Sequence, residues 1–444
     1  MSHLPTNLHK SPLDAWINGI TGGDCLRQSL QEYQTLKLRE TLIRAKKNSP
    51  FYREHLKDVD AQRIELPGGL QRIPFTNAAE LASEQGRFVC VSQDAIAHIV
   101  TLTSSGTSGE PKRLYFSAAD QERTLDFFAH GVATLAGNAD TMLIALPGQR
   151  QGGVGSLLAE GISRAGVRPV LHGLIERAEE TLQTVVREKA TCMIGFPVQM
   201  LWLASQRSAL AEEALTMLHS VVVCSDYVPG PLVQRLQALC GCEVYEHYGM
   251  TEMGMGGGVD CEAHCGYHLR EADLLFEIVD PESGRTLPDG ETGEVVFTTL
   301  TREAMPLIRY RTGDLSRFSA NGCPCGSELR NLERIQGRTK GGVSLGEEGK
   351  ISITDLDEVL FAIPGVVDFK ARLVRGANEH LEVTCCLPFG DTHALSQANA
   401  ALHDGIPAIG RAVRRGCLSV EVMAVSQPFA FSGEKRKIEV LTEL

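Results

Sequence analysis

The sequence predicts a multidomain α/β protein: a large domain with parallel sheets and a barrel-like β subdomain, followed by a small α+β lid domain. Three observations indicate this fold: buried apolar runs alternating with helical patterns, a later segment of paired strands and turns, and a length of 444 residues. A chain of this length exceeds the roughly 250–300 residues that one hydrophobic core usually serves. Two or more domains are therefore expected.

The alternating pattern lies between about residues 90 and 250, after a segment with helical spacing at residues 26–47. Residues 142–146, 191–195 and 220–224 are short apolar runs of the length expected for buried strands. Buried strands separated by helices are typical of a parallel sheet. Ligands of such sheets bind beyond the carboxyl ends of the strands.

Residues 274–314 show a different pattern. Strand-like runs at 276–279 and 294–298 are joined by a turn-rich segment, which predicts an antiparallel, barrel-like subdomain. After a glycine-rich boundary at 337–342, a helix at 353–361 and strands at 370–374 and 380–386 are expected. We therefore divide the chain into a large domain, 1–338, and a small mobile domain, 339–444.

Composition excludes several classes of protein. A net charge of −12 argues against a nucleic-acid-binding surface, so an anionic ligand must be met by local positive charge. No stretch approaches the roughly 20 apolar residues that cross a bilayer, which predicts no membrane partner. Thirteen cysteines, an odd number in a long chain, fit reduced thiols in the cytoplasm better than a disulfide framework.

The most informative segment runs from Thr103 to Lys112 and packs five hydroxyls, two glycines and a lysine directly after the mostly β-branched run 99–102. Hydroxyls and backbone N–H groups in such a loop can surround phosphate oxygens. The spacing differs from that of the P-loop, which argues against kinases and GTPases. A plain surface turn is the alternative interpretation.

Four further informative segments follow later in the chain, in this order: Tyr248–Glu252, Tyr310–Asp314, Gly337–Lys340 and Ser432–Lys435. Together with the hydroxyl-rich loop, they resemble the adenylate-forming superfamily of acyl-CoA synthetases, peptide-synthetase adenylation domains and luciferases. Residues 49–54 and 73–76 resemble the phenylacetate-CoA ligase branch of that superfamily. The resemblance covers the chain from about residue 48 to residue 437.

The resemblance implies an ATP site with the following roles. The β- and γ-phosphates would be held by Ser105, Thr107, Ser108 and Gly109, with support from Lys112. Thr251 would contact the α-phosphate, and Glu252 would bind the Mg²⁺ ion. Adenine would lie beside Tyr248 and Gly249, and ribose would be bound by Asp314 and Arg338. Carboxylate oxygen suits Mg²⁺, and one carboxylate can accept two ribose hydroxyls.

The same resemblance implies roles for two lysines near the small domain. Lys435 is the candidate catalytic lysine, although Glu434 stands where the family carries glycine and Lys437 is a close rival. Lys340 matches the hinge position about which the small domain would rotate between adenylation and thioester formation.

Two cysteine clusters predict a structural zinc site. Cys261 and His268, with Cys323 and Cys325 about sixty residues later, offer a tetrahedral set of thiolate and imidazole ligands. His264 and Cys265 are alternative ligands within the first cluster. Reduced cysteines packed as small hydrophobic residues are the competing interpretation.

The expected function is that of an ATP-dependent carboxylate–CoA ligase that uses ATP, Mg²⁺ and coenzyme A on a small carboxylic acid. An adenylyl-transferring ligase that stops at an AMP conjugate or loads a carrier protein is one alternative, and a non-catalytic nucleotide-binding regulator is another. A zinc hydrolase is disfavoured, because four such ligands would close the metal shell. The acid stays open, since Cys224–Asp226 replaces the Gly-Ala-Glu pattern of the family, and the sequence is compatible with a homodimer.

Overall fold

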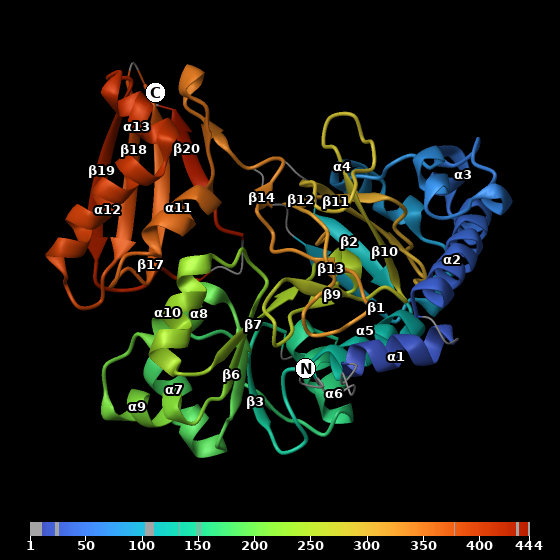
Figure 1. The fold of residues 1–444 in the computed structure, drawn as a ribbon, viewed down its shortest axis with the longest axis horizontal. Coiled ribbons are helices and arrows are strands. Elements are labelled where there is room, and N and C mark those ends of the chain that lie inside the picture. Colours follow the sequence, from blue (N-terminus) through green and yellow to red (C-terminus); the bar gives the residue numbers. More distant parts are fainter. Residues whose placement is uncertain are drawn as a thin grey trace, which may run out of the picture. The chain divides into compact units, whose positions relative to one another are not determined.

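The computed structural model describes residues 11–22, 26–102, 111–132, 134–148, 150, 152–376, 378–431 and 435–442. The chain divides into two compact units (Figure 1). The first consists of Met1–Asp140, Gly148–Leu171 and Tyr245–Thr339, and the second of Thr141–Pro147, His172–Val244 and Lys340–Leu444.

Polar side chains cap the starts of several helices of the first unit. They are α1 (Pro12–Thr21), α2 (Leu26–Asn48), α3 (Pro50–His55), α4 (Ala78–Glu84), α5 (Ala118–Val132) and α6 (Val154–Arg164). Ser49 caps α3 by accepting from the Tyr52 amide, and Pro50 follows at the first helical position. Asn77 and Glu80 form a capping box that starts α4.

Most strands of the first unit form antiparallel pairs. β1 (His98–Leu102) pairs with β2 (Lys112–Phe116) on either side of the hydroxyl-rich loop. β10 (Leu274–Val279), β11 (Gly293–Thr299), β12 (Tyr310–Ser316) and β14 (Gly337–Arg338) form a four-stranded sheet in that order. Short β8 (Gly258–Val259), β9 (Tyr267–Leu269) and β13 (Asn331–Leu332) continue from the carboxyl end of β7 (Glu243–Tyr248), and β4 (Arg168–Leu171) follows α6. The antiparallel pairing expected for residues 274–314 is therefore observed.

A buried ion pair holds the start of β12, the strand that carries Tyr310 and Asp314. The Arg309 guanidinium contacts the Glu277 carboxylate at 2.8 and 2.9 Å and donates to the Ile73 carbonyl at 2.7 Å. Arg309 has φ +46°, an unusual backbone conformation for a residue other than glycine. A buried charge without partners is costly, so these contacts define one orientation for this corner of the unit.

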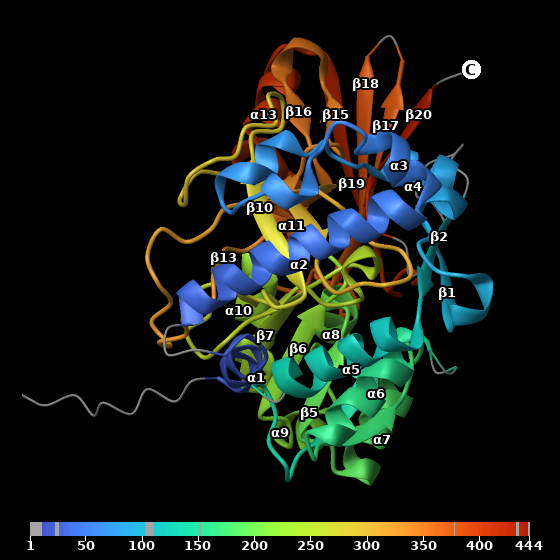
Figure 2. The ribbon, with the colours of Figure 1, turned by 90° about the vertical axis from the view of Figure 1, so that its right-hand side faces the viewer.

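Helix α2 packs along two loops of the first unit, and Figure 2 shows it at full length. Gln34 donates to the Glu271 carbonyl at 2.8 Å, and Thr41 donates to the Leu300 carbonyl at 2.8 Å. Arg44 donates to the Arg302 carbonyl at 2.6 Å. The helix thus fixes loops that lie more than 200 residues later in the chain.

The second unit contains the parallel strands that the apolar runs predict. β3 (Thr141–Ala145), β5 (Cys192–Gly195) and β6 (Ser220–Cys224) pair in parallel, and every residue in them is buried. The helices α7 (Ala178–Glu188), α8 (Pro197–Ala204), α9 (Ala209–Thr216) and α10 (Gly230–Cys240) accompany them. The predicted α/β class with parallel sheets is confirmed.

The C-terminal part of the second unit is a mixed α+β structure. It contains a hairpin of β15 (Val343–Ser344) and β16 (Lys350–Ile351), then α11 (Ile353–Leu360), β17 (Asp368–Arg375), β18 (Glu379–Cys386), α12 (Thr392–Gly405), α13 (Pro407–Arg414), β19 (Leu418–Val425) and β20 (Ile438–Thr442). Its four-stranded sheet has the order β19-β18-β17-β20. The expected helix and strands are all present, with slightly longer strands.

Contacts within the second unit join this α+β part to residues 172–244. The Glu358 carboxylate accepts from the Tyr227 hydroxyl at 2.7 Å and from the Gly230 amide at 3.2 Å. The rings of Phe196 and Phe431 lie 4.5 Å apart. Residues 340–444 therefore share a compact unit with residues 172–244, and the division into domains 1–338 and 339–444 stays a prediction. Among the helices described, none has the length and apolar character to span a bilayer.

Candidate functional site

The segment Tyr248–Glu252 forms a tight turn at the carboxyl end of β7. Thr251–Met253 is a single 3₁₀ turn, which Gly254 ends with φ +78°. Gly249 has no room for a side chain, since a Cβ there would lie 2.9 Å from both the Met255 carbonyl oxygen and the Gly256 Cα. The glycines of this segment therefore allow the backbone to fold tightly on itself.

The Glu252 carboxylate is buried and meets one cation. Lys112 Nζ, from β2, lies 2.6 Å from Glu252 Oε1, and the Tyr310 hydroxyl donates to the same oxygen at 3.4 Å. The Glu252 side chain is 4% exposed, so it depends on these partners for compensation of its charge. Burial, and then the Glu252 charge, raise the pKa of Tyr310, which stays protonated and able to donate.

Asp314 and Arg338 face each other on neighbouring strands. They are partners in the register of β12 and β14, and Arg338 Nε lies 3.2 Å from Asp314 Oδ1. The Tyr248 hydroxyl donates to Asp314 Oδ2 at 3.1 Å. Burial, and then the Asp314 charge, raise the pKa of Tyr248 well above its ordinary value. Tyr248, predicted to lie beside adenine, is thus hydrogen-bonded to Asp314, which with Arg338 is predicted to bind ribose.

The two groups belong to one site. Tyr310 and Asp314 lie on the same strand, and the charges of Arg338 and Asp314 both act on the Tyr310 hydroxyl. Seven of the predicted residues are assembled in this way: Lys112, Tyr248, Gly249, Thr251, Glu252, Asp314 and Arg338. They come from four segments that are distant in the sequence.

The other predicted residues, apart from the zinc ligands, are either not described or belong to the second unit. Ser105, Thr107, Ser108 and Gly109 lie outside the described residues. Lys340 and Lys435 belong to the second unit, where Lys435 and Lys437 are exposed. Arg436 between them pairs with the buried Asp357, whose pKa burial raises to about 7. This ion pair anchors the lysine-bearing segment to α11.

The predicted zinc ligands come together in the first unit. The ligand atoms of Cys261, His268, Cys323 and Cys325 all lie within 4.8 Å of one another. Cys261 Sγ and Cys323 Sγ are 3.6 Å apart, and Cys325 Sγ is 3.2 Å from His268 Nε2. Tetrahedral zinc with Zn–S bonds of about 2.3 Å places neighbouring sulfurs about 3.8 Å apart. The donor set and its spacing therefore fit zinc.

The two alternative ligands have other partners. His264 Nδ1 lies 2.8 Å from Asp260 Oδ2. Cys265 is exposed, and its thiol donates to the Ala263 carbonyl at 3.1 Å. Neither residue belongs to the cluster of four.

Two residues at the site were not singled out from the sequence. Tyr310 lies within a recognised segment, but its hydroxyl contact with Glu252 depends on the fold. Arg302 donates from Nη1 to the Glu252 carbonyl at 2.6 Å, although fifty residues separate the two. No local pattern could have revealed that contact.

Comparisons with known proteins agree with this geometry. The family model of "AMP-binding enzyme" matches residues 40–300. The phenylacetate-coenzyme A ligase of Thermus thermophilus is 31% identical over 359 residues, which are 79% of each chain. The enzyme of the same name from Aromatoleum evansii is 29% identical over 70% of this chain and 71% of its own length.

Solved structures share the fold. The crystal structure of 2-hydroxyisobutyryl-CoA ligase in the postadenylation state superposes with a TM-score of 0.76 at 20% identity, over 93% of this chain and 89% of that one. An anthranilate CoA ligase in complex with anthranoyl-AMP superposes with a TM-score of 0.55 at 17% identity, over 75% of this chain and 64% of that one. Since the family model spans more than half of the chain and a relative is 31% identical over 79% of it, the chain belongs to the family of AMP-binding enzymes, as its motifs predict.

Proposed function

We propose that this chain is an ATP-dependent carboxylate–CoA ligase. A carboxylate oxygen of a small acid attacks the α-phosphorus of ATP, pyrophosphate leaves and an acyl adenylate forms. The sulfur of coenzyme A then attacks the acyl carbon, and AMP leaves as the thioester forms. The observation that carries the proposal is the convergence of five residues in a chain whose relatives include phenylacetate-coenzyme A ligases: Lys112, Glu252, Tyr248, Asp314 and Arg338.

The residues of the first unit bind the nucleotide in this proposal. Asp314 and Arg338 bind the ribose, Tyr248 and Gly249 lie beside adenine, and Thr251 contacts the α-phosphate. Glu252 binds Mg²⁺, a hard cation that prefers carboxylate oxygen. Lys112 compensates the Glu252 charge at a contact of 2.6 Å and, with Ser105, Thr107, Ser108 and Gly109, faces the phosphates.

Catalysis needs charge stabilisation at the α-phosphate more than covalent chemistry by the protein. We assign that role to Lys435, which is exposed, whereas the neighbouring Arg436 pairs with the buried Asp357. Lys340 is the hinge of a C-terminal domain of residues 339–444. The homodimer and the cytoplasmic location stay predictions.

Pyrophosphate release identifies the reaction. With MgATP and a panel of aryl, short aliphatic and sulfur-bearing acids, we expect release that depends on the acid and accelerates with coenzyme A. An arylacetic acid is the first candidate, because the relatives are named for phenylacetate. Release indifferent to coenzyme A would favour adenylyl transfer. Tight ATP binding without any release would favour the non-catalytic regulator.

Substitution of Lys435 tests the assignment of the catalytic lysine. Lys435→Ala should lower acid-dependent pyrophosphate release by about 10²–10³-fold, the usual cost of removing one donor that stabilises transition-state charge. Binding of MgATP should persist in this variant. Lys437→Ala is the matched control, exposed two residues away, and should stay close to wild type. Equal losses in both variants, or activity that survives Lys435→Ala, would reject the assignment.

We also propose that Cys261, His268, Cys323 and Cys325 bind a structural zinc ion. Three of the four are buried, and the set fills a tetrahedral shell and leaves no position for substrate. His268 lies on β9, which pairs with β13 just after the Cys323–Cys325 segment. The ion would therefore pin the loop after β12 to the strands that follow β7.

Metal analysis of the purified protein should find one zinc ion per chain. Cys323→Ser should lose the zinc and lower Tm by roughly 5 °C or more, since each kcal/mol lost moves Tm by about 2–4 °C in a domain of 150–250 residues. Cys265→Ser, which removes an exposed neighbouring thiol, should retain both zinc and Tm. Full zinc content in Cys323→Ser, or loss of zinc in Cys265→Ser, would contradict this ligand set.

A further inference from the structure

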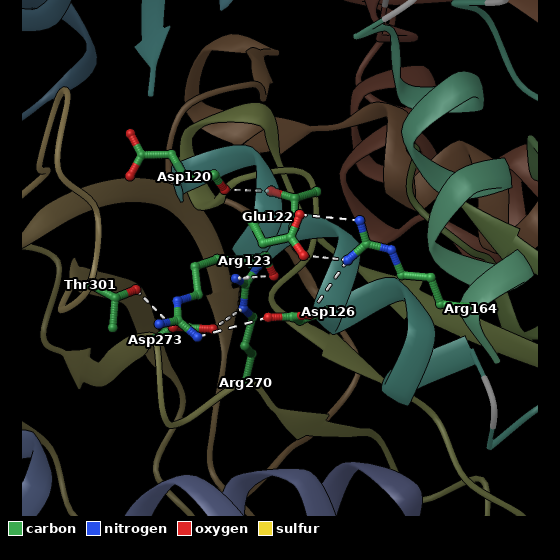
Figure 3. Close-up of polar contacts among 9 residues, drawn as sticks. Asp120, Glu122, Arg123, Asp126, Arg164, Arg270, Asp273 and Thr301 are labelled. Atoms are coloured by element: carbon green, nitrogen blue, oxygen red, sulfur yellow. Dashed lines mark hydrogen bonds and ion pairs between the residues drawn. The ribbon is translucent and has the colours of Figure 1, made fainter. Parts of the chain in front are cut away.

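Arg302 lies behind the Thr251–Met253 turn, at a small cavity of the first unit. The cavity has a volume of about 20 Å³, room for about one water molecule. Charged side chains line it, among them Arg123, Arg270, Asp120 and Asp273. Figure 3 shows Arg270 and Asp273 beside Thr301, with Asp120 and Arg123 on α5.

Two side chains at this cavity hold backbone carbonyls of the turn. Arg302 Nη1 donates to the Glu252 carbonyl at 2.6 Å, and Thr124 Oγ1 donates to the Gly254 carbonyl at 3.1 Å. Gly254 adopts φ +78°, a conformation that favours glycine, and a Cβ there would lie 2.9 Å from Arg302 Nη2. Glu252 is therefore held at its main chain from one side and at its carboxylate, by Lys112, from the other.

The orientation of Arg302 is itself determined by two helices. The Asp120 carboxylate, at the start of α5, accepts from the amides of Glu303 at 2.7 Å and Ala304 at 3.0 Å. Arg44 on α2 donates to the Arg302 carbonyl at 2.6 Å. The backbone on both sides of the Arg302 side chain is thereby fixed, and its guanidinium packs over the Phe116 ring at 5.0 Å.

Arg302 remains charged at neutral pH. Burial lowers the pKa of its guanidinium to about 10, against the opposing effect of Asp120, and the group stays protonated. A hydrogen bond from a charged donor is roughly twice as strong as one between neutral groups. The contact with the Glu252 carbonyl is therefore a charge-assisted hydrogen bond on the main chain of the turn.

We propose that Arg302 is a positioning residue for the divalent cation of the nucleotide. It acts through the main chain of Glu252: by holding that carbonyl, it directs the carboxylate toward Lys112 and Tyr310, and so determines where the cation binds. Thr124 assists through the Gly254 carbonyl. This inference rests on the proposed binding of MgATP, but it does not depend on the acid or on coenzyme A.

The test is equilibrium binding of ATP to the full chain as a function of Mg²⁺ concentration. In Arg302→Met, the half-saturating Mg²⁺ concentration should rise about tenfold or more, the usual cost of losing a hydrogen bond to a charged group. The affinity for ATP without Mg²⁺ should be unchanged. A general loss of structure would instead weaken ATP binding both with and without Mg²⁺. Arg302→Lys keeps the charge and should recover part of the affinity.

Three further variants keep the test decisive. Arg123→Met, at the same cavity but without a side-chain contact to the turn, should bind as wild type does. Thr124→Val should raise the half-saturating Mg²⁺ concentration by about twofold to tenfold. Because it removes no buried charge, this variant replaces Arg302→Met in the test if Arg302→Met fails to fold. In a Glu252→Gln background, Arg302→Met should add nothing, because both act through one carboxylate.

An unchanged Mg²⁺ dependence in Arg302→Met and Thr124→Val would overturn the proposal, as would equal losses with and without Mg²⁺. Additive effects of Arg302→Met and Glu252→Gln would also overturn it. Failure of the proposed ligase reaction is a separate result, seen as an absence of acid-dependent pyrophosphate release in the wild-type chain.

Discussion

The candidate site depends on the compensation of one buried carboxylate, that of Glu252. A carboxylate that is 4% exposed is costly unless cations and donors surround it, and here Lys112 and Tyr310 supply them. Those two residues lie on β2 and β12, and the carboxylate lies on the turn after β7. Satisfying this single charge therefore requires three distant segments to meet, and their meeting forms the candidate site.

Much of the fold could be predicted from the sequence, because the deciding signals are local. The runs at 191–195 and 220–224 are mostly apolar, and they form buried strands β5 and β6 with almost the expected bounds. Residues 26–47 have helical spacing and form α2. The grouping of residues 340–444 with 172–244 was not predicted, since contacts such as Tyr227 with Glu358 leave no local pattern.

At the candidate site, too, local sequence signals predict some residues, whereas long-range contacts leave no such signal. Residues in recognised segments, such as Tyr248, Asp314 and Arg338, are assembled by strand register and by the turn after β7. The sequence predicts Lys112 as support for the hydroxyl-rich loop or its charge, and no local pattern indicates its pairing with Glu252. No local pattern reveals the contacts of Arg302 and Asp120 either, because their partners are backbone atoms, which nearly every residue type presents.

In the proposed reaction, the Glu252 carboxylate binds the magnesium ion of the nucleotide. The most direct measurement is a Mg²⁺ titration of acid-dependent ATP–pyrophosphate exchange in the wild type and in Glu252→Gln, which keeps the shape of the side chain and removes its charge. We expect the half-saturating Mg²⁺ concentration to rise about tenfold or more in the variant, because a charged ligand is lost. Exchange with wild-type Mg²⁺ dependence in Glu252→Gln would contradict this role of Glu252.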